Sequence, residues 1–299
     1  MPDPERPPVP WTPTNFLALP PEQSSLDTAA AVLIPVPIDS TTSFRTGARH
    51  GPAAIITASA ALEDYDIELG VDVADFGIHT TPPLEPHVGD PHHMVERVGS
   101  AVSHYAAQGS GKLTGVIGGD HSASIGSAFA QLDRYPNLSV LYIDAHADLR
   151  DEYQGTRWGH GSGARRIAER CPISLIGVRN LALEERQYID ARRIPVCYWP
   201  PGNAGELDDI IAGLPSDVYI SVDLDVLDPA EMPAVGTPEP GGMRWLELTG
   251  ILRRVCQERH VVGFDVCELA PDQGLPAHSY VAAKLVYKLI AYALGPRWG

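Results

Sequence analysis

The chain has 299 residues, a formal net charge of −16 and 44% hydrophobic residues. The negative charge disfavours a nucleic-acid backbone or an anionic membrane as partner and favours a small cationic ligand. The length and hydrophobic content are typical of one domain with a substantial core, and the four cysteines, which lie in apolar runs, are expected to be buried free thiols.

Residues 1–30 begin with a proline-dense stretch and are predicted to form an extended arm, followed by a single catalytic domain over 31–299. The first residues lack the basic stretch and apolar core of a secretion signal. The most apolar late segment, 279–294, is interrupted by Lys284 and Lys288. We therefore expect a cytoplasmic protein without a membrane span.

From residue 31 onward, short apolar runs alternate with longer helical patterns, which is typical of repeated βα units and a mostly parallel sheet. The predicted strands cover 31–38, 113–119, 138–144, 173–178, 218–225 and 261–267. The predicted helices cover 52–63, 92–107, 122–133, 205–213, 245–257 and 278–293. The pattern predicts an α/β fold.

The strand predicted over 138–144 ends in alternating polar residues. Successive side chains of an extended segment point to opposite faces, so Asp144, His146 and Asp148 would share one side if the strand continues outward. The strand over 218–225 likewise ends in Asp223 and Asp225, two positions apart. Both clusters would lie at the carboxyl ends of strands, where sites form in parallel sheets.

A third strand end brings a histidine to the same edge. The strand over 113–119 ends in two glycines, which permit a tight turn, and is followed by Asp120 and His121. A lone Asp at a strand end usually caps a turn, and a lone His usually lies hydrogen-bonded beside the core. Three such clusters at three strand ends instead favour a shared site.

Charge predicts the occupant of this site. Four packed carboxylates repel one another, and two divalent cations would balance them, with one of the two histidines available to each ion. Ligands without thiolates favour Mn²⁺, with Zn²⁺, Co²⁺ and Fe²⁺ as alternatives. Water held between two such ions becomes a nucleophile near neutral pH, which predicts a hydrolase. The predicted ligands are His121, Asp144, His146, Asp148, Asp223 and Asp225.

The motifs GGDHS (118–122), DAHAD (144–148) and SVDLDVLDP (221–229) resemble the three metal-binding motifs of the ureohydrolases, the family of arginase and agmatinase. The resemblance extends from about residue 35 to the last helix and includes all six ligands. It implies a three-layer α/β/α sandwich around a mostly parallel eight-stranded sheet, two Mn²⁺ per subunit, and homotrimers or homohexamers.

The resemblance also assigns roles to residues outside the ligand set. Glu268 matches the glutamate that holds the substrate guanidinium, with which a carboxylate pairs well. His160 matches the histidine that passes a proton to the departing amine, and Asp148 would hold the nucleophile and receive its proton. Without the motifs, His160 would be interpreted as an exposed loop histidine and Glu268 as part of a surface ion pair.

The substrate is expected to be a small cationic guanidino compound. The stretch after Asp148 is closer to the agmatinase pattern, so agmatine, hydrolysed to putrescine and urea, is the first candidate. The tail would be read by loops 40–50, 150–160 and 231–242, with Asp151 or Glu152 receiving its ammonium unless they form a solvated cluster. Arg150 either enters the cleft, which would favour a carboxylate tail, or pairs with the neighbouring acids. The alternatives are arginase, guanidinobutyrase or formimidoylglutamase activity, or a catalytically silent metal-binding relative.

Overall fold

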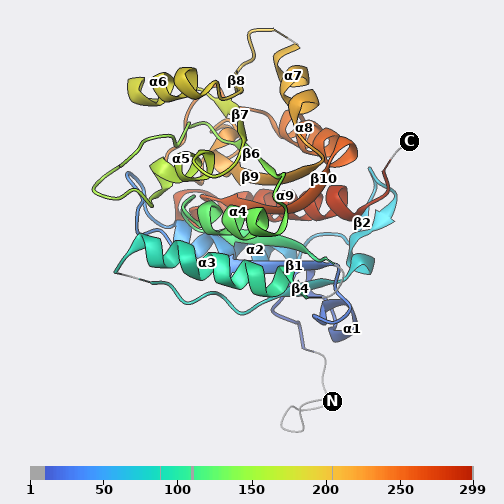
Figure 1. The fold of residues 1–299 in the computed structure, drawn as a ribbon. Helices are drawn as coiled ribbons and strands as arrows, with labels where there is room; N and C mark the ends of the chain where they lie inside the picture. Colours follow the sequence, from blue (N-terminus) through green and yellow to red (C-terminus); the bar gives the residue numbers. More distant parts are fainter. Residues whose placement is uncertain (1–10, 88, 109–110, 204, 298–299) are drawn as a thin grey trace.

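The computed structural model describes residues 11–87, 89–108, 111–203 and 205–297. Within these residues, the centre of the molecule is an eight-stranded sheet in which every neighbouring pair is parallel. Figure 1 shows it running from β4 to β8. The order is β4 (Ile78–Thr80), β1 (Ala31–Val36), β5 (Leu113–Gly118), β10 (His260–Cys267), β9 (Asp217–Asp223), β6 (Ser139–Ile143), β7 (Ile173–Val178) and β8 (Val196–Tyr198).

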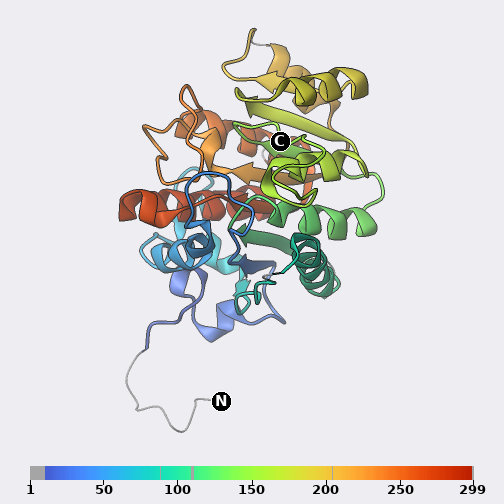
Figure 2. The ribbon, with the colours of Figure 1, turned by 90° about the vertical axis from the view of Figure 1, so that its left-hand side faces the viewer.

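Helices cover both faces of the sheet, and the layers are clear when the sheet is seen from its side (Figure 2). One face packs against α2 (Gly51–Ser59), α7 (Gly205–Gly213), α8 (Trp245–Glu258) and α9 (Pro276–Leu294). The other packs against α3 (Pro91–Ala106), α4 (Ala123–Arg134), α5 (Gly163–Ala168) and α6 (Leu183–Arg192). The predicted three-layer α/β/α architecture is confirmed.

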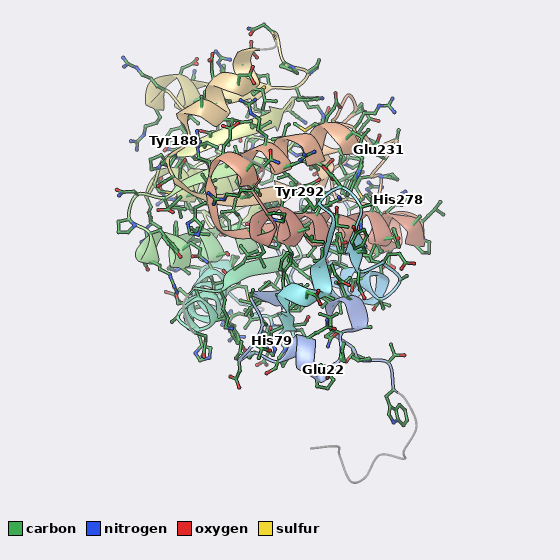
Figure 3. All side chains as sticks on the ribbon, turned by 90° about the vertical axis from the view of Figure 1, so that its right-hand side faces the viewer. Glu22, His79, Tyr188, Glu231, His278 and Tyr292 are labelled. Atoms are coloured by element: carbon green, nitrogen blue, oxygen red, sulfur yellow. The ribbon has the colours of Figure 1, made fainter. Side chains whose placement is uncertain are left out.

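The central strands are apolar because both of their faces are covered. Every residue of β1, β5, β6 and β7 is buried. Such strands form near-continuous hydrophobic runs, which is why the sequence located them to within two residues at either end. Figure 3 shows α8 and α9 lying across one of these faces.

The sequence missed the two outer strands, β4 and β8, which are three residues long. It also missed the helices α5 and α6, the short α1 (Pro21–Ser24), and a small antiparallel pair of β2 (Tyr65–Asp66) and β3 (Val71–Asp72). Three-residue strands at an edge carry too little hydrophobic periodicity to stand out.

The predicted arm lies partly outside the described residues, since 1–10 are not among them. Of the rest, Phe16, Leu17 and Leu19 are buried in the core beside α2. No helix among the described residues is long and apolar enough to cross a membrane.

Candidate active site

The predicted ligands after β6 converge by a route that the sequence did not predict. The strand ends at Ile143, so the alternation expected for 144–148 does not continue as a strand. Asp148 instead has a left-handed backbone with φ of 50°, which non-glycine residues seldom adopt. This turn, rather than strand periodicity, directs its carboxylate toward the other acids.

His121 is the centre of the first cluster. It lies three residues beyond the end of β5, and its Nδ1 lies 3.0 Å from Asp144 Oδ2, 3.2 Å from Asp223 Oδ2 and 3.6 Å from Asp148 Oδ2. All four side chains are buried. One imidazole nitrogen therefore faces three carboxylate oxygens, two from the segment after β6 and one from the end of β9.

His146 is the centre of the second cluster. Its Nδ1 lies 3.0 Å from Asp225 Oδ2 and 3.6 Å from Asp144 Oδ1. Asp144 thus presents Oδ2 to His121 and Oδ1 to His146, so that its carboxylate connects the two clusters. A short 3₁₀ turn over Leu224–Val226, capped by Asp223, places Asp223 and Asp225 on the same site.

The electrostatics of the cluster favour the binding of divalent cations. Burial and the charges of neighbouring carboxylates raise the pKa of Asp144 and of Asp223, because the acids repel one another. Burial alone would lower the pKa of His146, but the charges of Asp225 and Asp144 and their hydrogen bonds to His146 together outweigh burial and raise that pKa. The Asp225 pKa falls to about 2, because His146 outweighs the effect of burial there. Without a metal, protons balance the charge that four carboxylates bring together. Oxygen and imidazole donors of this kind fit two divalent cations.

The second nitrogen of His121 is held on the opposite side of the ring. Nε2 lies 2.9 Å from Ser221 Oγ, and the Ser221 hydroxyl donates to Asp265. Because that hydroxyl donates its only proton to Asp265, its oxygen accepts a hydrogen bond from His121 Nε2–H. This arrangement leaves Nδ1 as the nitrogen that can hold a cation. The Tyr142 hydroxyl adds a contact at 2.8 Å from both His121 Nδ1 and Asp148 Oδ2.

Glu268 lies directly after β10 and is buried beside the cluster. Its backbone has φ of 72°, and its carboxylate accepts a hydrogen bond from the His121 backbone N–H at 2.8 Å. Burial, followed by the charge of Asp120, raises the pKa of Glu268 well above its usual value. Among the residues that the structure describes, no lysine or arginine pairs with this buried carboxylate, and a substrate guanidinium would supply such a partner.

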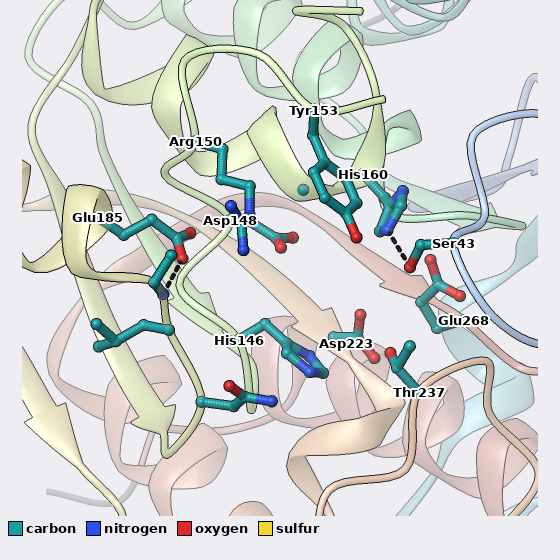
Figure 4. Close-up of a pocket in the computed structure, with 14 residues that line it drawn as sticks. Ser43, His146, Asp148, Arg150, Tyr153, His160, Glu185, Asp223, Thr237 and Glu268 are labelled. Carbon is teal, nitrogen blue, oxygen red and sulfur yellow. Dashed lines mark hydrogen bonds between the residues drawn. The ribbon is translucent and has the colours of Figure 1, made fainter. Parts of the chain in front are cut away.

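A cavity of about 270 Å³ opens above these acids (Figure 4). His146, Asp148, Asp223 and Glu268 form its floor, and Figure 4 shows His160 and Tyr153 side by side at its wall. Its full lining is Ser43, His146, Asp148, Arg150, Tyr153, His160, Gly161, Asn180, Leu181, Ala182, Glu185, Asp223, Thr237 and Glu268.

His160 lies at the start of a 3₁₀ turn over His160–Ser162, with its ring edge-on to Tyr153 at 5.7 Å between centroids. Its Nε2 lies 3.2 Å from Ser43 Oγ, and its Nδ1 lies 3.3 Å from Thr41 Oγ1. The histidine is thus hydrogen-bonded through both ring nitrogens. It shares the cavity with the acid cluster, as a proton carrier for the leaving amine would have to.

Of the three charged residues after Asp148, one lines the cavity and two lie outside its lining. Arg150 lines the cavity and pairs with Glu184 at 3.2 Å, with its guanidinium 4.8 Å from the centre of the Tyr153 ring. It does not pair with the neighbouring acids. Asp151 is outside the cavity lining and instead pairs with Arg157 and Arg166. The exposed Glu152 is also outside that lining.

The sequence missed one wall of the cavity. Asn180, Leu181, Ala182 and Glu185 follow β7 and lie at the same carboxyl edge as the acid clusters. Their signal was available, because β7 was predicted and sites in parallel sheets use the loops at this edge. Each of the three predicted tail-reading loops does contribute to the lining, through Ser43, Tyr153 and Thr237 respectively.

The comparison with known proteins explains this arrangement. Residues 29–291 match the model of the family described as "Arginase family". The chain belongs to the arginase family. The predicted resemblance to ureohydrolases is therefore confirmed, and this member of the family is a hydrolase of C–N bonds in linear amidines.

Similar members carry polyamine-related names. The chain is 37% identical to the N(1)-aminopropylagmatine ureohydrolase of Synechocystis, covering 91% of this chain and 90% of the relative. It is 32% identical to the agmatinase of Pyrococcus horikoshii, over 87% and 90% of the two chains. Among solved structures, the agmatine ureohydrolase of Thermoplasma volcanium superposes with a TM-score of 0.85 at 29% identity, covering 95% of each chain.

Proposed function

We propose that this family member is a manganese-dependent amidinohydrolase that releases urea from a guanidino compound with a cationic tail. The observation that carries the proposal is the convergence of His121, His146 and four aspartates in one cluster, part of which lines a cavity together with Glu268. Mere metal binding would not need the unpaired carboxylate of Glu268. The proposed ligands of two Mn²⁺ are His121, Asp144, His146, Asp148, Asp223 and Asp225.

Two divalent ions, when bound, supply an activated water as the nucleophile. The protein's own groups then orient the substrate and move its protons. Glu268 pairs with the guanidinium and directs its carbon toward the acid cluster. Asp148 holds the attacking water and receives its proton, and His160 passes a proton to the leaving nitrogen so that the amine departs. Urea and a polyamine are the products.

The tail is proposed to be that of a polyamine. Arg150 does not add a net positive charge to the cavity wall, because Glu184 balances it. Its guanidinium lies between the Glu184 carboxylate and the Tyr153 ring, and these contacts support a wall that can accommodate a cation. We therefore rank N1-aminopropylagmatine first and agmatine second, ahead of substrates with a carboxylate tail. The names of the relatives support this order.

The test is a substrate panel with the manganese-loaded full chain. N1-aminopropylagmatine, agmatine, arginine, guanidinobutyrate and formimidoylglutamate are each incubated, and urea, formamide and the matching amine are quantified. We expect the highest kcat/KM for the two cationic tails, with Asp148→Asn as the inactive matched protein. Preference for arginine or guanidinobutyrate would overturn the tail assignment, formamide would indicate a different reaction, and no turnover would favour a silent relative.

A further inference from the structure

Thr41 and Asp120 have no part in the reaction proposed above, but Thr41 contacts the His160 ring and Asp120 contacts Thr41. The Thr41 hydroxyl is 3.3 Å from His160 Nδ1 and 3.1 Å from the carboxylate oxygen Oδ2 of Asp120. We propose that Asp120 and Thr41 are positioning residues that keep the imidazole proton of His160 on Nδ1 and leave Nε2 to exchange the catalytic proton. This inference rests on the proposed function only for the role of His160 in turnover.

The donors around Asp120 determine the direction of each hydrogen bond that connects Asp120, Thr41 and His160. Asp120 is fully buried, and its Oδ2 accepts from both the backbone N–H and the hydroxyl of Thr41, each at 3.1 Å. Its Oδ1 accepts from the backbone N–H and the hydroxyl of Ser122. A carboxylate surrounded by four donors can only accept, so the single proton of the Thr41 hydroxyl is committed to Asp120.

The consequence falls on His160. With its proton engaged, the Thr41 hydroxyl oxygen can only accept, and it does so from the His160 backbone N–H at 3.0 Å. The contact to the ring must therefore be Nδ1–H donating to Thr41. In the neutral imidazole, Nε2 then carries the lone pair. Nε2 is the nitrogen that faces Ser43, which lines the cavity, so the tautomer presents a base where the substrate binds.

The backbone holds these groups in register. The Asp120 N–H donates to the Ile38 carbonyl at 2.7 Å, and a Cβ at Gly119 would overlap that same carbonyl oxygen. On the other side, a Cβ at Gly159 would lie 3.1 Å from the Thr41 Cβ. Both glycines allow the backbone to approach Thr41 closely. Thr41 can therefore contact His160, which is 119 positions away, and Asp120, which is 79 positions away.

The same device, in the opposite sense, acts on His121. There Ser221 and Asp265 hold the proton on Nε2 and leave Nδ1 facing the carboxylates. A hydroxyl committed to a buried carboxylate thus determines which ring nitrogen carries the proton when each imidazole is neutral. The other nitrogen would hold a cation in His121 and would take a proton in His160.

The experiment compares Thr41→Val, which removes the hydroxyl at nearly constant volume, with Thr41→Ser, which keeps it, in the manganese-loaded full chain. We expect Thr41→Val to lower kcat by about 10- to 100-fold with KM changed less than about threefold, and Thr41→Ser to recover most of this loss. Thr57→Val, at an exposed helical threonine, is the matched control. Metal content is measured for every variant.

Asp120→Asn supplies a second perturbation of nearly unchanged shape. Its amide can donate to the Thr41 hydroxyl oxygen and release that proton toward Nδ1, which would favour the wrong tautomer and lower kcat by at least about 100-fold. If both residues act through one chain, the double variant Thr41→Val/Asp120→Asn is no slower than the slower single variant. If the fold-loss of kcat in the double variant equals the product of the two single losses, the two residues act independently and the proposal is overturned.

A direct readout is independent of turnover. The protein is labelled with ¹⁵N-histidine and loaded with diamagnetic Zn²⁺, and the His160 signals are assigned by their loss in His160→Asn. We expect a protonated Nδ1 and an unprotonated Nε2 in the wild type, and a mixture in Thr41→Val. A wild-type proton on Nε2, or a Thr41→Val kcat within twofold of wild type, would overturn the proposal. Should the wild type hydrolyse no guanidino compound, the proposed function fails while the spectra still decide the tautomer.

Discussion

The carboxylate of Glu268 accepts a hydrogen bond from the backbone N–H of His121 at 2.8 Å. The group proposed to anchor the substrate is thereby fixed to the residue proposed to hold a metal ion, and both follow strands that are direct neighbours in the sheet. The guanidinium carbon would thus be positioned relative to the metals by one rigid connection and not by a mobile loop.

Glu268→Gln should separate charge from geometry. A glutamine oxygen can still accept from His121, so two ions should remain bound, whereas the pairing with the guanidinium loses its charge. We expect kcat/KM to fall about 10- to 100-fold, corresponding to the roughly 1.5–3 kcal/mol of a charged hydrogen bond. Steady-state kinetics with metal analysis checks this, and Glu63→Gln, at an exposed glutamate outside the cavity, should behave as wild type.

Metal binding should release protons. Despite the burial of His121, Tyr142 and three carboxylates raise its pKa well above the usual value. Asp225 and Asp144 together raise the pKa of His146 in the same way, so both histidines hold protons in the metal-free cluster at neutral pH. A cation must displace these protons, and its affinity therefore falls as the pH falls. Calorimetry of Mn²⁺ binding in buffers of different ionisation enthalpy measures the release. Binding without proton release would contradict this picture of the cluster.

Removal of metal with a chelator should abolish urea formation, and Mn²⁺ should restore it. Because only the folded cluster gathers the ligands, Mn²⁺ at about 100 times its dissociation constant should stabilise the fold by about 2.7 kcal/mol. Elemental analysis should give two ions per chain, and about one in Asp223→Asn. If the melting temperature does not rise when Mn²⁺ is added, a preformed metal site is contradicted.

The Arg150–Glu184 pair should control selection of the tail. Arg150→Ala frees Glu184, so we expect kcat/KM for N1-aminopropylagmatine to rise relative to that for guanidinobutyrate. Glu184→Gln leaves the Arg150 charge unbalanced, and the ratio should move the other way, by about two- to tenfold for each change at so exposed a pair. Selectivity that is unchanged in both variants would remove this pair from substrate recognition.

Glu68 should make stability depend on pH. Burial alone would raise its pKa, but hydrogen bonds from Lys288 at 2.7 Å and Tyr292 at 2.8 Å lower the pKa below its usual value of 4.5 (Tyr292 is labelled in Figure 3). A group with a depressed pKa stabilises the fold above its unfolded pKa and loses this contribution as the pH falls through the folded value. The difference in unfolding free energy between wild type and Glu68→Gln, from denaturant titrations, should therefore be largest above about pH 5 and shrink in acid.

The sequence was sufficient for features that are encoded locally. Buried parallel strands such as β6 are continuous apolar runs, and the acids that follow them are adjacent in the chain, so the strands and the predicted ligand set could be derived from short stretches. The same reasoning supposed that Asp148 follows strand alternation, which its left-handed backbone contradicts. Strand ends turn in ways that period-two patterning does not describe.

Contacts between distant segments could not be predicted. Thr41 and Asp120 are 79 positions apart, and Ser221 and His121 are 100 apart. Thr41 and Ser221 are ordinary hydroxyl residues in the sequence, and each gains its role only when the fold brings it beside a histidine. Likewise, nothing near Arg150 in the chain indicates that its partner is Glu184 instead of Asp151.

The brevity of the outermost strands has a consequence for how copies of this protein meet. Within the described residues, β4 and β8 each offer only three residues of backbone at the sheet margins. Long unpaired edge strands favour β-sheet pairing between molecules, and short edge strands disfavour it. Subunits that associate are therefore expected to do so through helix and loop surfaces and not by joining their sheets edge to edge.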